Sequence, residues 1–265
     1  MFPFVSPLPT PNDIFLFALV LCRIAGLFAA LPVFGGRRLP VKVKAVAVVS
    51  ISIVCLPVLK ITPPPVPTEL ITVALLVLKE MMIGLTIAFI TQIVFAAIEF
   101  SGQIIGLQMG FSISSVIDPA MGNQSQIMSV FQTLLATLFF LSLNIHHFFI
   151  RAIIDSFTII PLGGWHLNKE IIRFLVSGTA DLFVLGIRIA APVMVTLLLT
   201  SVVLGIMARA FPQMNIFMVS MPLNIGIGFM VLGMTLLLFF HVLEVAFGGL
   251  KGQVELLLRL MAKGG

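Results

Sequence analysis

The sequence predicts an all-α, membrane-associated protein built from helical hairpins. Of its 265 residues, 60% are hydrophobic and only 9% are charged, whereas about a quarter of a soluble domain is charged. About six apolar stretches can each supply the roughly 20 residues that a spanning helix needs. The net charge of +5 is modest, and no Lys/Arg run is dense enough to indicate nucleic-acid binding. We therefore expect a membrane protein without a nucleic-acid partner.

The predicted helices follow one another with short connections. Their approximate ranges are 14–34, 45–62, 70–100, 126–150, 182–207 and 216–247. The second is short, and the third and sixth exceed what a bilayer requires, so these two are expected to be tilted, broken or extended beyond it. The connections are a basic loop at 35–44, a Pro-rich turn at 63–67, a mixed-charge linker at 151–181 and a short turn at 209–215.

The charges of the connections conflict with six simple spans. The basic loop at 35–44 should be cytoplasmic. Six spans then place the C-terminal tail, with Lys251, Arg259 and Lys263, on the opposite side, against the positive-inside rule. Either the span count is wrong or some segments do not cross the bilayer.

The C-terminal tail has an amphipathic pattern. Its apolar residues recur with helical spacing and share one face; they are Leu250, Val254, Leu257, Leu258 and Met261. We expect this face to lie on a membrane surface or to pack on a partner.

The connection at 108–126 is unusual because it combines helix breakers with apolar residues. Gly110, Asp118 and Pro119 interrupt any helix there. Loops that run through water are polar, and irregular apolar backbone near a membrane needs protein around it or a cavity to line. We expect a plug, gate or re-entrant element whose main residues are Met109, Gly110, Phe111, Ile113, Val116, Ile117, Asp118, Pro119 and Met121.

A stripe of small residues leads into this connection. Gly102, Gly106 and Gly110 recur every four residues and would let another backbone approach closely. The partner could be another helix of this chain, or the stripe could form a subunit interface or a hinge. Gly84 and Ala88 form a weaker pair of the same kind.

Ionisable residues inside apolar stretches indicate function by default. Lys79 and Glu80 are adjacent, so they point about 100° apart on a helix and need separate partners. A charged face buried against other subunits explains the whole set as well as a proton relay does. The set comprises Arg23, Lys79, Glu80, Glu99, Asp181, Arg188 and Glu244.

The sequence contains no established catalytic or metal-binding motif. There is no P-loop, no H-E-x-x-H and no paired Cys/His spacing, so no catalytic residue, metal or cofactor is assigned. A minor alternative is an intramembrane serine protease, since Gly110-Phe111-Ser112 matches a G-x-S and His241 could act as base. A second alternative is a self-contained secondary transporter of a small solute, with broken helices and with Glu99 and Arg188 near its site.

Several motifs together resemble one family. The pattern GxxIGLQMGFSxxxxIDP occupies Gly102–Pro119 and is followed in order by four shorter motifs. These are Asn144-x-His146, then Asp155-Ser156-Phe157 with Pro161-x-Gly163, then Arg209-x-x-Pro212-Gln213-x-Asn215-Ile216-Phe217, and Pro222. The sequence is similar to the FliR family of flagellar export-gate proteins, which are related to the T subunits of virulence type III secretion systems.

The resemblance implies a place in a multi-subunit assembly. Members of this family join P-type and Q-type subunits in a conical helical pore, with B-type switch and A-type export proteins as further partners. The resemblance divides this chain into a P-like region at 1–180 and a Q-like hairpin with its tail at 181–265. The hairpin turn then contains Arg209, Pro212, Gln213 and Asn215.

The resemblance also implies a function and a location. The protein is expected to pass unfolded flagellar substrates across the bacterial inner membrane at the flagellar basal body. The family's plugging loop corresponds to the segment that is already unusual here, at 108–126. In the closed state its apolar side chains would fill the channel and exclude ions.

Overall fold

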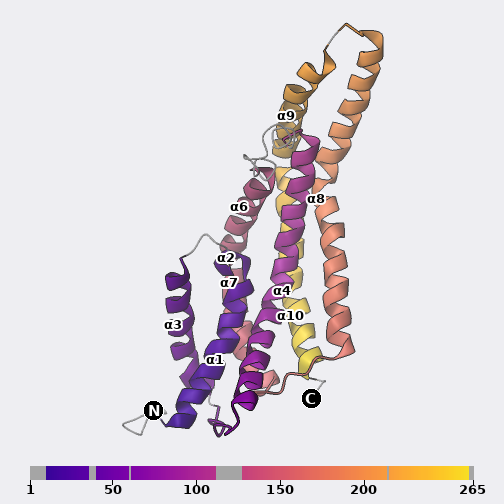
Figure 1. Cartoon of the computed structure of the whole chain (residues 1–265). Coiled ribbons are helices and arrows are strands. Elements are labelled where there is room, and N and C mark those ends of the chain that lie inside the picture. The colour runs from indigo at the N-terminus through magenta and orange to yellow at the C-terminus, as the bar shows by residue number, and fades with distance from the viewer. Residues whose placement is uncertain (1–9, 36–39, 60, 112–126, 214, 263–265) are drawn as a thin grey trace. The chain divides into compact units, whose positions relative to one another are not determined.

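The protein is all-helical in the part that the computed structural model describes, which is residues 10–35, 40–59, 61–111, 127–213 and 215–262. Five helices are long and apolar enough to cross a membrane, or up to six if a bent pair counts as one span. This confirms the predicted fold class. The helices are α1 (Pro11–Ala30), α2 (Pro32–Gly35), α3 (Val41–Leu59), α4 (Leu70–Gln108), α6 (Ile127–Ser142), α7 (Ile145–Ile159), α8 (Lys169–Ala210), α9 (Ile216–Met234) and α10 (Leu236–Ala262) (Figure 1).

The chain divides into two compact units. Unit 1 comprises residues 1–93, 144–178 and 249–265, and unit 2 comprises residues 94–143 and 179–248. The boundaries fall inside α4, α8 and α10, so each of these helices contributes to both units.

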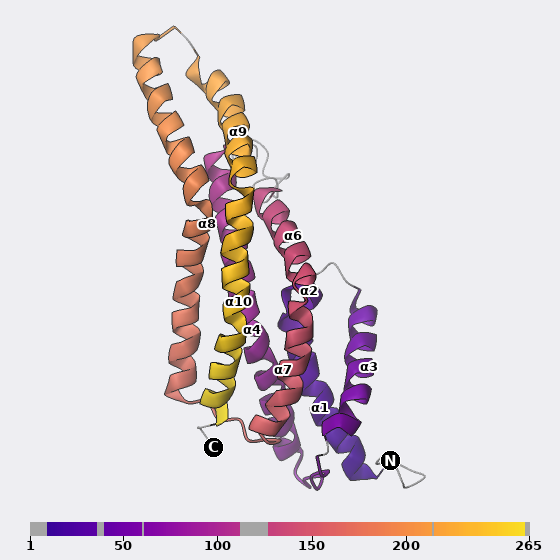
Figure 2. The same ribbon diagram turned by 180° about the vertical axis from the view of Figure 1, so that it is seen from behind.

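Unit 1 is organised around α1. This helix begins with a capping box in which Thr10 accepts from the Asp13 backbone and Asp13 accepts from the Thr10 backbone, with Pro11 in the first turn. Its central residues Leu19, Val20, Ile24 and Leu27 are fully or almost fully buried. Helix α3 lies beside α1 in both views (Figure 1, Figure 2), but most of its apolar surface remains exposed. Unit 1 thus has a buried core helix and an apolar outer helix.

Unit 2 has an apolar core and a long hairpin. Phe95, Phe140 and Phe247 come from α4, α6 and α10, and their ring centroids lie 5.5–5.8 Å apart. Such tilted and edge-to-face pairs add to the burial of the rings themselves. Helices α8 and α9 form the hairpin, whose turn lies at the tip drawn in orange (Figure 2). Much of the outer surface of α8 is apolar and exposed.

The predicted mixed-charge linker at 151–181 is wrong, because most of it is helical. Helix α7 continues to Ile159 and α8 begins at Lys169. The charged residues that indicated a linker, such as Arg151, Asp155 and Arg173, lie on exposed faces of these helices. The Pro-rich turn is confirmed, since residues 61–67 are not helical.

Two of the predicted apolar segments contain breaks. The sixth is interrupted at Thr235, which separates α9 from α10 with φ −93° and ψ 5°. The fourth bends by 66° between α6 and α7, where Asn144 adopts the left-handed conformation with φ 54°. The third, by contrast, is one helix of 39 residues. Length alone therefore did not distinguish a broken segment from an extended one.

The predicted surface role of the C-terminal tail is also wrong. All five residues of its apolar face are at most 2% exposed within the chain. The face packs inside unit 1, where Asn168 Nδ2 also donates to the Leu260 carbonyl at 3.1 Å. The amphipathic pattern was correct, and its apolar side covers this chain's own core instead of a lipid surface or a partner.

Candidate functional site at the end of α4

Helix α4 ends in a Schellman motif immediately before the unusual connection. Gly110 has φ +88°, its N–H bonds to the Leu107 carbonyl at 3.1 Å, and the Phe111 N–H bonds to the Gly106 carbonyl at 3.1 Å. These two bonds satisfy the last carbonyls of a helix and need a left-handed residue at this position, which glycine provides without steric cost. Gly110 is thus the residue that terminates α4.

The small-residue stripe makes an internal contact in unit 2. A Cβ on Gly102 would overlap the Ser129 Cα of α6 and lie 2.7 Å from the Ser129 nitrogen. Gly106, one turn further along α4, is also buried. At Gly102 the stripe therefore brings α4 and α6 of the same chain into backbone contact, which is one of the three alternatives considered from the sequence.

The last turn of α4 packs on α9. Met109 is fully buried. Three of its side-chain atoms lie only 2.7–2.9 Å from the position that a Cβ on Gly228 would occupy. Beyond Gly110, the ring of Phe111 meets Phe229 edge to face with centroids 6.4 Å apart. The surrounding buried cluster consists of Ile105, Met109, Met128, Ala190, Val193 and Leu197.

The predicted site residues differ in what the structure describes. Met109, Gly110 and Phe111 lie together at the end of α4, as described above. Ile113, Val116, Ile117, Asp118, Pro119 and Met121 lie outside the described residues, as does Ser112 of the protease alternative. Their role as a plug therefore stays a prediction.

The predicted hairpin turn lies between α8 and α9. Arg209 is in the last turn of α8, while Pro212 and Gln213 form the turn itself, and all three are exposed. Asn215 precedes α9 without a side-chain capping bond. The turn residues therefore have their side chains free of tertiary packing in this chain.

Unit 1 contains a buried ion pair that links three elements. Arg23 Nε of α1 donates to Glu80 Oε2 of α4 at 2.6 Å, and both side chains are 0% exposed. The Arg23 Nη1 and Nη2 atoms also donate to the Ile160 carbonyl at 3.3 Å, and Nη1 donates to Ser156 Oγ at 3.1 Å. Phe157 lies under the guanidinium, 3.9 Å from ring centroid to Cζ. The charge of Arg23 is therefore fully accommodated.

Lys79 and Glu80 meet at one glycine. The two residues were predicted to need separate partners, and Glu80 alone pairs with Arg23, but its Oε1 also accepts from the Gly163 N–H at 2.8 Å. Lys79 Nζ donates to the Gly163 carbonyl at 3.1 Å. Gly163 has φ +72°, so this turn conformation favours glycine. Lys79 and Glu80 therefore fix the α7–α8 connection through the backbone carbonyl and N–H of Gly163.

The remaining ionisable groups do not converge on a site. Glu99, Asp181, Arg188 and Glu244 are exposed on the chain, and Glu244 lies 4.0 Å from the exposed His241. In the part that the structure describes, no group of three or more His, Cys, Asp or Glu residues could hold a metal ion. His146 and His147 stack on each other with centroids 4.1 Å apart.

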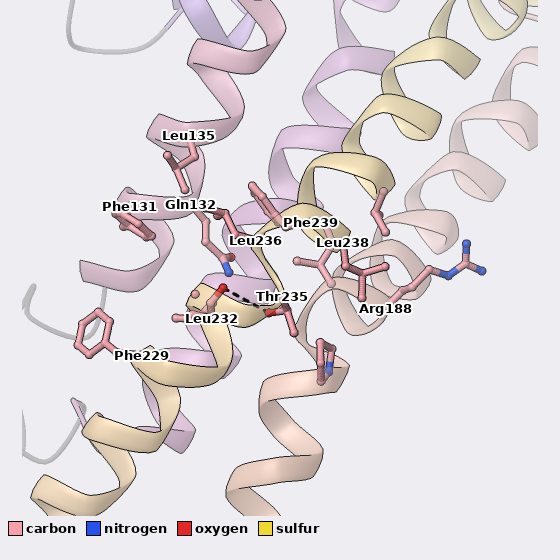
Figure 3. Close-up of a pocket in the computed structure, with 14 residues that line it drawn as sticks. Phe131, Gln132, Leu135, Arg188, Phe229, Leu232, Thr235, Leu236, Leu238 and Phe239 are labelled. Atoms are coloured by element: carbon pink, nitrogen blue, oxygen red, sulfur yellow. Dashed lines mark hydrogen bonds between the residues drawn. The ribbon is translucent and has the colours of Figure 1, made fainter.

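A cavity of about 230 Å³ in unit 2 lies beside the helix breaks. Its walls come from α6, α8, α9 and α10 and are mainly apolar (Figure 3). Pro192 of α8 and Thr235 both line it, and the guanidinium of Arg188 points away from Thr235 (Figure 3). Proline removes a helix hydrogen bond, and the Thr235 hydroxyl bonds the Val231 carbonyl at 2.8 Å. The cavity therefore lies where α8 contains a proline and where α9 gives way to α10.

Two close helix contacts made by glycines were not predicted from the sequence. These glycines are Gly26 and Gly228. Gly26 lies three residues after Arg23, on the same face of α1. This pairing could have indicated that another helix packs closely on that face. Gly228 had no such signal, because its partner Met109 lies more than a hundred residues away.

The fold is that of a polytopic α-helical membrane protein. Its buried charged groups, Arg23 and Glu80, pair with each other and hold helices together. Comparison with known proteins narrows this class to bacterial export: residues 14–250 match the family described as "Bacterial export proteins, family 1". The FliR flagellar biosynthetic protein of Bacillus subtilis is 33% identical, with 87% of this chain and 90% of the relative covered. Those of Aquifex aeolicus and Escherichia coli are 32% and 31% identical, with 85% and 78% of this chain and 87% and 79% of the relatives covered.

The chain belongs to the FliR family of flagellar export proteins. The predicted family is thereby confirmed, and so is the location in the bacterial inner membrane at the flagellar basal body, which agrees with the apolar spanning helices. The relatives are named as biosynthetic proteins of the flagellum and not as enzymes.

Proposed function

We propose that this chain is a pore-forming subunit of the flagellar type III protein export gate. Unfolded flagellar substrates pass through a channel that the chain builds with its partners. The segment at 108–126 closes this channel in the resting state. The proposal deepens the family assignment, since the names of the relatives state flagellar biosynthesis and no more.

The observation that carries the proposal is the way α4 ends. Its last turn is buried and apolar at Met109, it is terminated by Gly110, and Phe111 continues the apolar surface onto α9. Irregular backbone that follows a membrane helix is tolerated only where protein buries it or where it lines a cavity. Apolar side chains in a constriction exclude ions because dehydrating an ion is costly.

The partners are proposed to be P-type and Q-type gate subunits, with B-type switch and A-type export proteins adjoining them. Apolar residues on the outer face of α8, such as Leu198, Val202 and Ile206, are 54–67% exposed. Exposed apolar surface of this extent needs lipid or protein to cover it. In this proposal residues 1–180 are P-like and 181–265 are Q-like, and the exposed face of the hairpin packs on neighbouring subunits.

The test is deletion of residues 110–120 in cells that assemble the gate, with membrane conductance as the measurement. We expect ion leak to rise while the chain still copurifies with its partners. The control replaces Glu170 and Arg173, two exposed residues near the start of α8, by alanine, which should leave conductance unchanged. Unchanged conductance in a deletion variant that still assembles would contradict closure by this segment.

A secondary transporter of a small solute is the second candidate, and the bent helices favour it. The 66° bend between α6 and α7 and the break at Thr235 are of the kind that places solute sites near the middle of a membrane. A transporter acts as a monomer or simple dimer. Measuring the particle mass in mild detergent separates the two functions, because the gate requires two further apolar proteins in the particle.

A further inference from the structure

We propose that Gly228 and Phe229 of α9 form a seat that fixes the end of α4, which makes them positioning residues for the channel-closing segment. This inference rests on the proposed function for its consequence, but the seat itself is a contact that can be tested alone. The seat consists of Gly228 and Phe229, and the part it holds consists of Met109 and Phe111.

The first half of the seat is a notch in α9. Gly228 is buried, and a Cβ added to it would lie 2.7 Å from Met109 Cγ, 2.8 Å from Cε and 2.9 Å from Sδ. The Met109 side chain thus occupies the space that any other residue at 228 would fill. Since Met109 is 0% exposed, it has little room to move aside in a close-packed interior.

The second half of the seat is an aromatic contact. The rings of Phe111 and Phe229 lie 72° apart in orientation with centroids 6.4 Å apart, an arrangement that aromatic pairs favour. Phe229 is the residue next to Gly228, so α9 presents the notch and the ring side by side. Phe111 and Met109 are likewise separated only by Gly110.

The two contacts flank the residue that terminates α4. A helix end held on one side of its cap can rock about that point, whereas contacts on both sides of Gly110 fix both position and direction. The Schellman hydrogen bonds at Gly110 and Phe111 keep the short stretch between the contacts rigid. The direction in which the chain leaves α4 is therefore set by α9, more than a hundred residues further along the sequence.

The contact is tested by disulfide formation in the assembled gate, in a background with Cys22→Ala and Cys55→Ala. The pair Met109→Cys and Gly228→Cys should oxidise readily, because the added Cβ at 228 lies next to the Cγ position of residue 109. The control pair Met109→Cys and Gly226→Cys should not, since nothing lies within 4 Å of a Cβ at 226. Equal oxidation of both pairs, or none of the first, contradicts the seat.

The consequence is tested by resting ion leak. Gly228→Val places a branched side chain in the notch and should raise leak about fivefold or more, whereas Gly228→Ala should do less because a flexible methionine can partly yield. Gly226→Val is the matched control on the same helix and should leave leak unchanged. Adding Met109→Ala to Gly228→Val should return leak toward the resting value, a rescue that general damage to α9 does not predict.

The outcomes separate the inference from the proposed function. If deletion of 110–120 raises leak but Gly228→Val does not, the segment closes the channel and the seat does not position it. If the 109–228 disulfide forms but neither Gly228→Val nor the deletion raises leak, the contact exists and closure by this segment is wrong. A leak from Gly226→Val equal to that from Gly228→Val overturns the role of the notch.

Discussion

The interiors of the two units are stabilised by different kinds of interaction. The centre of unit 1 is an ion pair, Arg23 with Glu80, in which both side chains are 0% exposed. The centre of unit 2 is mainly apolar, and it contains a neutral buried hydrogen bond in which Ser101 Oγ donates to Gln132 Oε1 at 2.7 Å. Breaking a buried ion pair leaves an uncompensated charge, whereas one apolar contact can be exchanged for another at small cost.

The ion pair in unit 1 and the apolar packing in unit 2 respond differently when a helix shifts. In unit 1, Arg23 and Glu80 each have several partners at fixed geometry, so a shift of α1, α4 or the α7–α8 connection breaks several hydrogen bonds together. In unit 2, the end of α4 is held through the apolar side chains of Met109 and Phe111, which pack on α9. Unit 1 therefore depends on charged groups that keep their partners, whereas this part of unit 2 depends on close apolar packing.

The largest expected effect comes from removing one member of the ion pair. Glu80→Ala should lower the free energy of unfolding in detergent by about 3–5 kcal/mol, because Arg23 stays buried without its countercharge. The control is Glu99→Ala on the same helix, where the side chain is exposed and the effect should be within about 0.5 kcal/mol. Similar losses from the two variants would remove the distinction between the units.

The next effect tests whether close helix contacts are equally strict in both units. Gly84→Ala puts a Cβ onto the Arg23 carbonyl and 2.7 Å from the Leu27 nitrogen, and Gly102→Ala puts one onto Ser129. Because backbone atoms cannot swing aside, each should cost at least about 2 kcal/mol of unfolding free energy. Gly252→Ala, with nothing within 4 Å, should be neutral or stabilising by up to about 1 kcal/mol. A mild effect of Gly102→Ala alone would show that unit 2 relaxes more readily.

A smaller effect is expected where α10 joins unit 1. Asn168 Oδ1 accepts from the Ile171 N–H at 2.7 Å at the start of α8, and its Nδ2 donates to the Leu260 carbonyl. Asn168→Ala loses both bonds and should cost about 1.5 kcal/mol. Asn168→Asp keeps the first bond and should cost less. Hydrogen exchange at the end of α10 should rise in both variants, and protection that stays unchanged would contradict the link.

The smallest effect should come from the polar contact in unit 2. Gln132→Leu removes a neutral hydrogen bond with Ser101 and keeps an apolar side chain of similar size, so the cost should be about 1 kcal/mol. The measurement is the same unfolding titration used for Glu80→Ala. A loss as large as that of Glu80→Ala would mean that the stability of unit 2 also depends on a buried polar interaction.

The sequence predicted those features that depend on local composition. Helix positions followed from the apolar stretches, and the Pro-rich turn followed from residues 63–67. The amphipathic face ending at Met261 was visible in the spacing of its residues. Its partner was not, because a helical face shows that something covers it but does not say what. Similarly, the charges near Arg151 marked an exposed helix face that resembled a linker.

Pairings across long separations were beyond the sequence. Arg23 and Glu80 were each recognised as unusual, but nothing in a single chain indicates that two such residues meet 57 positions apart. Gly228 was not recognised at all, since α9 is predominantly apolar and its glycines, Gly226, Gly228 and Gly233, follow no distinguishing pattern. Gly226 is exposed with nothing near an added Cβ, whereas Gly228 is buried beside Met109, and the sequence alone does not reveal this difference.

The division of the chain also bears on the order of biosynthesis. Unit 1 includes residues from Gly249 onward, which leave the ribosome after all of unit 2 has been translated. Until Leu250, Val254 and Leu257 are translated, the apolar surface of unit 1 that they bury stays exposed. A nascent chain stalled before this point would present that surface to quality-control proteases, so chains that include these residues are expected to persist longer in the membrane.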